Sequence, residues 1–155
     1  MVSVLPLRAV HAAAARALLD EALAHTPYSE LPHLALERAL RGDGAESLGL
    51  VAAFAGTVEG VVLYGLVAGS RGAAKLHAVA AREEGRQGIA HRLLVAASND
   101  LRVRGARFLV AESPDDAALA SAVALLEACD FEHVGRVADY HRDGVDLLLL
   151  RRDLV

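Results

Sequence analysis

The sequence predicts a mixed α/β domain that forms one folding unit. Segments with helical periodicity alternate with short apolar runs typical of strands, in the order α-α-β-β-β-α-β-α-β-β. The length of 155 residues suits one sizeable core, and 54% hydrophobic against 23% charged residues indicates a packed globule. Because no repeat, linker or low-complexity segment divides the chain, we expect residues 1–155 to form a single domain.

The first part of the chain predicts two helices followed by a hairpin. Val10–Ala24 places its larger apolar side chains on one face at helical spacing. Tyr28–Arg41 predicts a second, shorter helix with Ser29 as its N-cap. Leu48–Ala55 and Val61–Ala68 are strand-like runs, and the polar, glycine-containing segment GTVEG between them predicts a hairpin turn.

The middle of the chain predicts a strand, a helix and a second strand. Lys75–Ala80 is an apolar run that follows the break GSRGA. The helix that follows ends at Gly105 and leads to a short strand at Phe108–Glu112. The apolar stripe of that helix consists of Ala90, Leu94, Ala97 and Leu101.

The last part predicts one more helix and a closing hairpin. Ser113–Asp116 is typical of a helix start, because it offers a hydroxyl cap, a proline for the first turn and two acids near the positive end of the helix dipole. The helix Ala117–Cys129 then carries four apolar residues inward: Leu119, Ala122, Val123 and Leu126. Val134–Tyr140 and Val145–Arg152 predict strands around the turn HRDG.

Charge, cysteine and histidine content exclude several classes of function. The net charge is −4 and no block of Lys or Arg stands out, so we expect no binding to nucleic acid or to an anionic membrane. Cys129 is the single cysteine, and neither a signal peptide nor a membrane-length apolar run is present, so we expect a cytoplasmic protein. The histidines lack metal-ligand spacing, so we expect no metal.

The segment REEGRQGIAHRLL, Arg82–Leu94, connects the strand Lys75–Ala80 to the next helix. Glycine lets the backbone approach a ligand there, and the first helical turn offers N–H groups without helical partners. An anion such as phosphate fits this arrangement. The alternative is a turn that needs glycine for its geometry alone. The motifs G-x-x-x-x-G-K-S/T and G-x-G-x-x-G are absent, which argues against P-loop and Rossmann sites.

Two motifs and the order of elements carry a resemblance to a known family. Leu76-His77-Ala78-Val79 is followed by Gly85–Ala90, and Ala122–Phe131 supplies a closing pattern. In these features the sequence resembles the GNAT superfamily of acyl-CoA-dependent N-acyltransferases, whose signature Q/R-x-x-G-x-G/A follows a strand ending like L-x-x-V. The resemblance covers essentially the whole chain. It implies a mixed, mostly antiparallel central sheet flanked by helices.

The resemblance also implies a binding site for acetyl-CoA as co-substrate. The pyrophosphate would lie against backbone N–H groups of the glycine-rich segment, and pantetheine would lie along the strand that precedes it. Arg86 and His91 would face the phosphates, or else lie in solvent as ordinary surface residues. The cofactor-binding residues implied are Ala78, Val79, Ala80, Gly85, Arg86, Gln87, Gly88, Ile89, Ala90 and His91.

The sequence departs from the family pattern at positions that matter for chemistry. Gly85 stands at the Q/R position of the signature. Leu126 stands where family members often place a tyrosine that reprotonates the CoA thiolate, and Leu119 stands where they place an asparagine. Neither leucine can donate a proton, so the cofactor site is better supported by the sequence than the catalytic groups.

The sequence offers three catalytic candidates, His77, Tyr64 and Tyr140, and two further residues that would assist them. His77 has an ordinary pKa near 6.5 that suits a general base, with a core histidine bonded to a carbonyl as the alternative. Tyr64 would orient the substrate or donate a proton, unless it serves core packing. Tyr140, with His141, lies in the last hairpin near where family substrates enter, or in a solvated turn. Glu112 would relay a proton or only end its strand.

We therefore expect an N-acetyltransferase that moves an acetyl group from acetyl-CoA to a primary amine by direct attack. The acceptor would be a small molecule or a peptide. The alternatives are a non-catalytic acyl-CoA-binding or partner-binding module of the same fold, and an enzyme for longer acyl chains. Val145–Asp153 is apolar on both faces, and together with the resemblance it indicates a homodimer.

Overall fold

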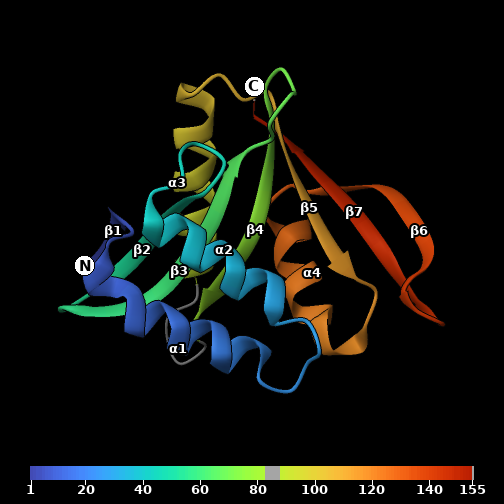
Figure 1. Cartoon of the computed structure of the whole chain (residues 1–155), viewed down its shortest axis with the longest axis horizontal. Helices are drawn as coiled ribbons and strands as arrows, with labels where there is room; N and C mark the ends of the chain where they lie inside the picture. The colour runs from blue at the N-terminus through green and yellow to red at the C-terminus, as the bar shows by residue number, and fades with distance from the viewer. Residues whose placement is uncertain (83–87, 155) are drawn as a thin grey trace.

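A twisted sheet with helices on both faces organises the chain (Figure 1). The computed structural model describes residues 1–82 and 88–154. Two short 3-10 turns, η1 (Ala9–His11) and η2 (Ala117–Leu119), precede α1 and α4. The helices and strands of the described residues are β1 (Val2–Pro6), α1 (Ala12–Leu23), α2 (Glu30–Arg41), β2 (Leu48–Phe54), β3 (Thr57–Leu66), β4 (Ala73–Ala81), α3 (Ile89–Val103), β5 (Phe108–Pro114), α4 (Ala120–Ala128), β6 (Glu132–Arg142) and β7 (Val145–Asp153).

The strands form one seven-stranded sheet in the order β1-β2-β3-β4-β5-β7-β6. Every neighbouring pair is antiparallel except β4 and β5, which run parallel. The parallel connection is made by α3, as parallel strands require a crossover. The predicted mixed, mostly antiparallel sheet flanked by helices is confirmed.

The core consists of two apolar layers, one on each face of the sheet. Helices α1 and α2 cover one face, where Leu19 and Leu36 pack over Val61 and Leu63. Helices α3 and α4 cover the other face. That second layer contains Val62, Tyr64, Ala74, Leu76, Leu93, Leu94, Leu101, Leu126 and Leu150. Successive side chains of a strand point into opposite layers, because side chains alternate between the two faces of a sheet.

Strands β4 and β5 separate soon after they meet. Their pairing covers only Ala73–Leu76 against Phe108–Ala111, although β4 continues to Ala81. On its other edge, β5 pairs with β7 along its whole length, Phe108–Pro114. Figure 1 shows the two strands diverging toward their carboxyl ends. This splay opens a backbone edge of β4 in the middle of the sheet.

Several sequence-based expectations need correction. Strand β1 was not predicted, although it pairs with β2 along Val2–Pro6. The hairpin after β2 is confirmed, but its turn is Ala55-Gly56, where both φ angles are positive, and β3 begins at Thr57. Ser29 occupies the N-cap position of α2 without a side-chain cap bond.

The predicted helix start at Ser113–Asp116 is partly wrong. Ser113 and Pro114 complete β5, because they pair with Leu148 and Leu147 of β7. Asp116 is the capping residue, and its carboxylate accepts a hydrogen bond from the Ala118 N–H at 3.0 Å. A 3-10 turn follows, and the α-helix proper begins at Ala120. Ala122, which was expected to face inward, is exposed.

Candidate active site

A β-bulge at His77 lies at the branch point, the position where strands β4 and β5 stop pairing. In the pairing of β3 with β4, Leu63 lies opposite Ala78 and Tyr64 lies opposite Leu76, so His77 is the extra residue. It is also the first residue of β4 beyond the pairing with β5. Among the described residues, no strand pairs with the β5-facing edge of β4 after Leu76. Backbone groups there are available to a ligand.

The bulge turns two consecutive side chains to the same face of the sheet. Ala74 and Leu76 belong to the α3–α4 layer, as do Val79 and Ala81, whereas Ala78 and Ala80 belong to the α1–α2 layer. His77 therefore lies beside Ala78 on the α1–α2 face, where Arg38 of α2 is near enough to affect its charge. The neighbouring Ala78 side chain is a single methyl group.

The His77 ring is half-buried and anchored by one nitrogen. Its Nε2 lies 3.1 Å from the carbonyl oxygen of Glu46. Burial lowers the pKa of His77 below its ordinary value, the bond to the Glu46 carbonyl opposes this shift, and the charges of Lys75 and Arg38 add to the lowering. The imidazole is then neutral near pH 7, so Nε2–H donates to the carbonyl and Nδ1 is a proton acceptor.

Gly65 positions the carbonyl that anchors His77. A Cβ at Gly65 would overlap the Glu46 carbonyl oxygen, so only glycine lets the segment before β2 cross β3 at this point. The Leu66 N–H also donates to the Ala45 carbonyl at 2.8 Å. Gly65 was not among the site residues predicted from the sequence, although an isolated glycine inside a strand is a signal for such a close approach.

Two charged residues lie across the branch point. Lys75 Nζ is 3.4 Å from Glu112 Oε1, and both side chains are about two-fifths exposed. Their neighbours Leu76 and Ala111 point into the α3–α4 layer, so this pair lies on the same face as His77. The pair links the two strands where their backbone pairing ends, with the modest strength of a solvent-exposed ion pair.

Tyr64 lies on the opposite face from His77. Its side chain is 1% exposed in the α3–α4 layer, and its hydroxyl donates to Asp100 Oδ2 at 2.8 Å. Arg104 binds the same carboxylate oxygen at 3.0 Å. Burial, and then the bond to Asp100, raise the pKa of Tyr64 far above its ordinary value. The structure does not bring Tyr64 and His77 together on one face.

Helix α3 begins directly after a glycine turn, as the sequence indicated. Gly88 has a φ of +99°, in the left-handed region that favours glycine, and stands directly before Ile89. A Cβ at Gly60 would lie 2.8 Å from both Ile89 and Leu93, so Gly60 lets this helix end pack closely on β3. Gly85, Arg86 and Gln87 lie outside the described residues.

His91 and Leu126 lie near the cysteine at the end of α4. His91 Nδ1 is 3.2 Å from the Sγ atom of Cys129, and burial raises the pKa of that thiol. Leu126 is 6% exposed within the α3–α4 layer, so the position of the expected tyrosine is apolar and enclosed. Leu119 is half-buried in the turn before α4.

A cluster of polar and aromatic side chains, whose contacts were not predicted from the sequence, lies beyond the end of β5. Tyr28, from the α1–α2 linker, donates its hydroxyl to Asp116 Oδ2 at 2.8 Å. Arg142, at the end of β6, binds the same oxygen at 3.3 Å. The His141 ring lies edge-on to Tyr28 and to Tyr140, with centroids 5.6 and 5.0 Å apart. Tyr140 itself is 59% exposed.

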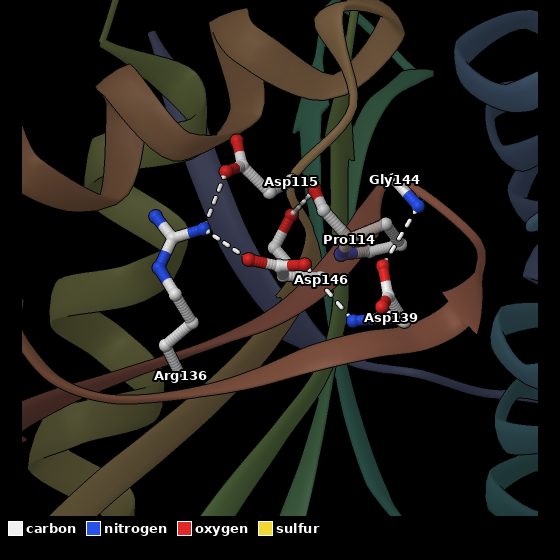
Figure 2. Close-up of polar contacts among 7 residues, drawn as sticks. Pro114, Asp115, Arg136, Asp139, Gly144 and Asp146 are labelled. Carbon is white, nitrogen blue, oxygen red and sulfur yellow. Dashed lines mark hydrogen bonds and ion pairs between the residues drawn. The ribbon is translucent and has the colours of Figure 1, made fainter.

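The β6–β7 hairpin is held to β5 by a separate network (Figure 2). Arg136 Nη1 lies between two carboxylates, 2.8 Å from Asp115 and 2.7 Å from Asp146. Asp146 also accepts the Asp139 N–H, and Asp139 accepts the Gly144 N–H. This network lies within the β5–β7 part of the sheet.

The described residues contain neither a metal-binding cluster nor a membrane-spanning helix. Residues 1–82 and 88–154 contain no group of three or more His, Cys, Asp and Glu side chains that could hold a metal ion. In the same part of the chain, no helix has the length and apolar composition needed to cross a membrane.

Comparison with known proteins gives matches at the level of structure. No model of a known protein family matches the sequence, and no curated protein matches it. A Desulfovibrio desulfuricans protein assigned to the GNAT acetyltransferase family superposes with a TM-score of 0.88 at 20% identity, over 100% of both chains. A ribosomal-protein-alanine N-acetyltransferase from Brucella melitensis superposes with a TM-score of 0.75 at 23% identity, over 97% of this chain and 99% of that one.

A third solved structure is an aminoglycoside 6'-N-acetyltransferase complexed with coenzyme A. It superposes with a TM-score of 0.80 at 12% identity, over 100% of this chain and 97% of that one. At these identities the likeness concerns the fold, and the three structures share it along their whole length. The chain therefore has the fold of the GNAT family of acetyltransferases.

Proposed function

We propose that this chain is an acetyl-CoA-dependent N-acetyltransferase that moves the acetyl group to a primary amine by direct attack. The observation that carries the proposal is the splay of β4 and β5 with the bulged His77 at its branch point. It offers an unpaired strand edge and a half-buried neutral imidazole in one place. Solved structures with this fold include acetyltransferases and one complex with coenzyme A.

The residues present fit a coenzyme A molecule in two respects. The β5-facing edge of β4 beyond Leu76 has backbone groups for an amide-containing chain such as pantetheine, alongside Ala78, Val79 and Ala80. The glycine-led start of α3 supplies N–H groups at a helix N-terminus, which suits a pyrophosphate. Those N–H groups belong to Gly88, Ile89, Ala90 and His91, and we assign the preceding Gly85, Arg86 and Gln87 to the same site.

His77 is our candidate general base. Nδ1 takes the proton that the amine loses as its nitrogen forms the new bond to the acetyl carbon, and the bond from that carbon to sulfur breaks. A thiolate is a good leaving group, so a dedicated acid is helpful rather than obligatory. Leu126 cannot supply the proton, and the Tyr64 hydroxyl is held by Asp100. Solvent or the exposed Tyr140 is the remaining proton source for the thiolate.

A second candidate is a non-catalytic acyl-CoA-binding or partner-binding module. The observation that favours it is the enclosed, apolar environment of Leu126, where the expected proton donor is replaced. This module would bind CoA through the same β4 edge and α3 start. It would not release a free thiol in the presence of any amine.

We also propose that the protein is cytoplasmic and forms a homodimer. Val145, Leu147, Leu148 and Leu150 of β7 are already buried within one chain, so β7 has less need of a partner than its sequence indicated. The outer strand β6 instead exposes Val134, Val137 and Tyr140 along a free edge. Sedimentation at micromolar concentration would test the dimer, and a monomer would overturn it.

One experiment separates the two candidate functions. Titration calorimetry with CoA tests the cofactor site, and a thiol-release assay with acetyl-CoA and a panel of amines tests transfer. The proposed enzyme binds CoA and releases thiol with at least one amine. Binding without release would favour the module. Absence of binding would refute both proposals.

A further inference from the structure

Glu59 is a buried acidic residue near the start of β3. In the pairing of β2 with β3, Ala53 lies opposite Val58 and Ala52 lies opposite Gly60, so Glu59 is an extra residue in β3. Its side chain is only 6% exposed. A second β-bulge of the sheet thus takes a carboxylate out of solvent, at the opposite end of β3 from the His77 anchor.

Glu59 contacts Arg82, the residue that directly follows β4, in two ways. The Arg82 N–H donates to the Glu59 carbonyl oxygen at 3.0 Å, and Arg82 Nε lies 3.7 Å from Glu59 Oε2. The Arg82 side chain is 48% exposed, so the pair joins a buried carboxylate to a guanidinium at the surface. Main chain and side chain together fix the point where the chain leaves β4.

The next residue of β3, Gly60, receives the start of α3. A Cβ at Gly60 would lie 2.8 Å from Ile89 and from Leu93, so the helix packs directly on the β3 backbone. Both of these α3 side chains are buried. Two adjacent residues of β3 therefore hold the end of β4 and the beginning of α3.

These contacts fix both ends of the connection between β4 and α3. A connection with two fixed ends has fewer conformations than one with a loose end, so less entropy is lost when a ligand orders it. The N–H groups of Gly88 and Ile89, which we assigned to the pyrophosphate, lie at the second fixed end. Their position relative to β4 depends on the contacts of Glu59 and Gly60.

Stability alone does not account for a buried carboxylate at this position. Removal of a carboxylate from water costs free energy, and apolar residues in place of a buried ion pair often leave stability unchanged or raise it. The charge does not favour an anion nearby either, because a carboxylate repels a phosphate group. Control of backbone position is the contribution of Glu59 that favours binding of an anion at the start of α3.

We infer that Glu59 is a positioning residue for CoA, which holds Arg82 at the end of β4 and thereby keeps the first turn of α3 in the place that binds the pyrophosphate. The inference rests on the proposed function, because CoA is the proposed ligand of that turn. Glu59 acts through the backbone and makes no contact with the cofactor.

The test is a double-variant cycle read by titration calorimetry with CoA. Glu59→Met and Arg82→Met should each weaken CoA binding by about tenfold, within the range that interacting pairs reach. The double variant should lose no more than Glu59→Met alone, because the two residues act as one unit. The KM for acetyl-CoA should rise by the same factor, while kcat at saturating acetyl-CoA changes little.

The direction of the change in Glu59→Met separates position from charge. Loss of a negative charge near the phosphates would by itself tighten CoA binding, whereas loss of position weakens it. Glu59→Gln keeps the volume of the side chain and removes only its charge, so it provides the same comparison if Glu59→Met does not fold. Native or tighter CoA binding in the variant that folds would overturn the inference.

Glu37→Met is the control for the chemical change. Glu37 also pairs with an arginine, since its Oε1 lies 2.9 Å from Arg16, and this pair joins α1 to α2. The variant should bind CoA with native affinity. An equal loss of affinity in Glu37→Met would overturn the inference, and so would additive losses in the double variant, because neither result requires a connection between Glu59 and Arg82.

Amide hydrogen exchange separates this inference from the proposed function. The Arg82 N–H donates to Glu59, and the Arg92 N–H donates to the Gly88 carbonyl at 2.8 Å in the first turn of α3. Both amides should exchange about fivefold faster or more in Glu59→Met, the scale of losing one hydrogen bond. If the native protein binds no CoA, the proposed function fails, and unchanged exchange at both amides would overturn the inference independently.

Discussion

The role of His77 is open to a direct test by two substitutions. His77→Ala removes the imidazole, and His77→Gln keeps an N–H that reaches toward the Glu46 carbonyl but offers no basic nitrogen. If Nδ1 accepts the proton of the amine, both variants lose this proton acceptor. We expect kcat/KM to fall roughly a hundredfold or more in each, the usual scale for losing a general base.

The two variants differ in stability for a reason that the structure supplies. The bond from Nε2 to the Glu46 carbonyl measures 3.1 Å, and loss of such a bond costs about 1 kcal/mol. Burial of the ring adds a further loss in the alanine variant, through the space left beside Ala78. His77→Gln should therefore unfold at nearly the native urea concentration, and His77→Ala at a lower one.

The direction of the His77 pKa shift determines how kcat/KM and stability depend on pH. Burial lowers the pKa of His77, so the native kcat/KM should rise with pH through a midpoint below 6.5 and both variants should lack that limb. The same shift means that the unfolded chain binds the proton more tightly than the folded protein does. His77 thus contributes stability that is present above pH 6.5 and is lost as the pH falls through its folded pKa.

The measurements are kcat/KM from pH 5.5 to 8.5 at saturating acetyl-CoA, and urea unfolding at pH 5.5 and 7.5. Full activity in both variants with an unchanged pH profile would show that His77 is a structural histidine. Water or Glu112 would then be the base. A large loss in His77→Ala with native activity in His77→Gln would equally contradict proton transfer, because the bond to Glu46 alone would account for it.

Three further substitutions test the surroundings of the site. Gly88→Asp should weaken CoA binding in calorimetry by more than tenfold. The loss should exceed that in Gly88→Asn, which shares the left-handed backbone strain but adds no charge. Equal CoA affinity in Gly88→Asp and the native protein would place the pyrophosphate elsewhere. Gly65→Ala should destabilise the protein by about 1–3 kcal/mol and lower kcat/KM, because the added Cβ meets the Glu46 carbonyl. Gly135→Ala serves as the control, because its added Cβ meets only the flexible Leu149 side chain, at 3.1 Å. Leu126→Tyr should not raise kcat, since a hydroxyl in the apolar α3–α4 layer lacks a partner; a severalfold gain would show that a proton donor belongs there.

Much of the fold was predictable because its elements have strong local patterns. The helical stripe that includes Leu94 and Leu101 and the apolar runs of β3 and β7 appear in the structure where their periodicity placed them. Strand β1 had a signal as well, since Val2 and Val4 alternate with exposed residues. A five-residue edge strand is short, and its assignment depends on β2, which lies more than forty residues away.

The features that could not be predicted from the sequence depend on contacts between residues that lie far apart in the chain. Ser113 and Pro114 have the local chemistry of a helix start, and pairing with β7 makes them strand instead. The Tyr28–Asp116 bond joins residues 88 positions apart, a separation that leaves no local pattern. The candidate base could be chosen from sequence as a histidine in an apolar run. Its anchoring carbonyl could not, because that contact depends on Gly65 and the path of the segment before β2.

The bulge explains how a strand between two apolar layers presents the candidate base on one face. In a regular strand, residues 77 and 78 would point to opposite faces, and the two apolar layers would continue without interruption. The extra residue places His77 and Ala78 side by side on the α1–α2 face and returns Val79 to the α3–α4 layer. The same register shift coincides with the end of the β4–β5 pairing. A single inserted residue thus brings together a basic nitrogen, a small neighbour and an edge of β4 that β5 no longer pairs with, and the proposed acetyl transfer depends on this combination.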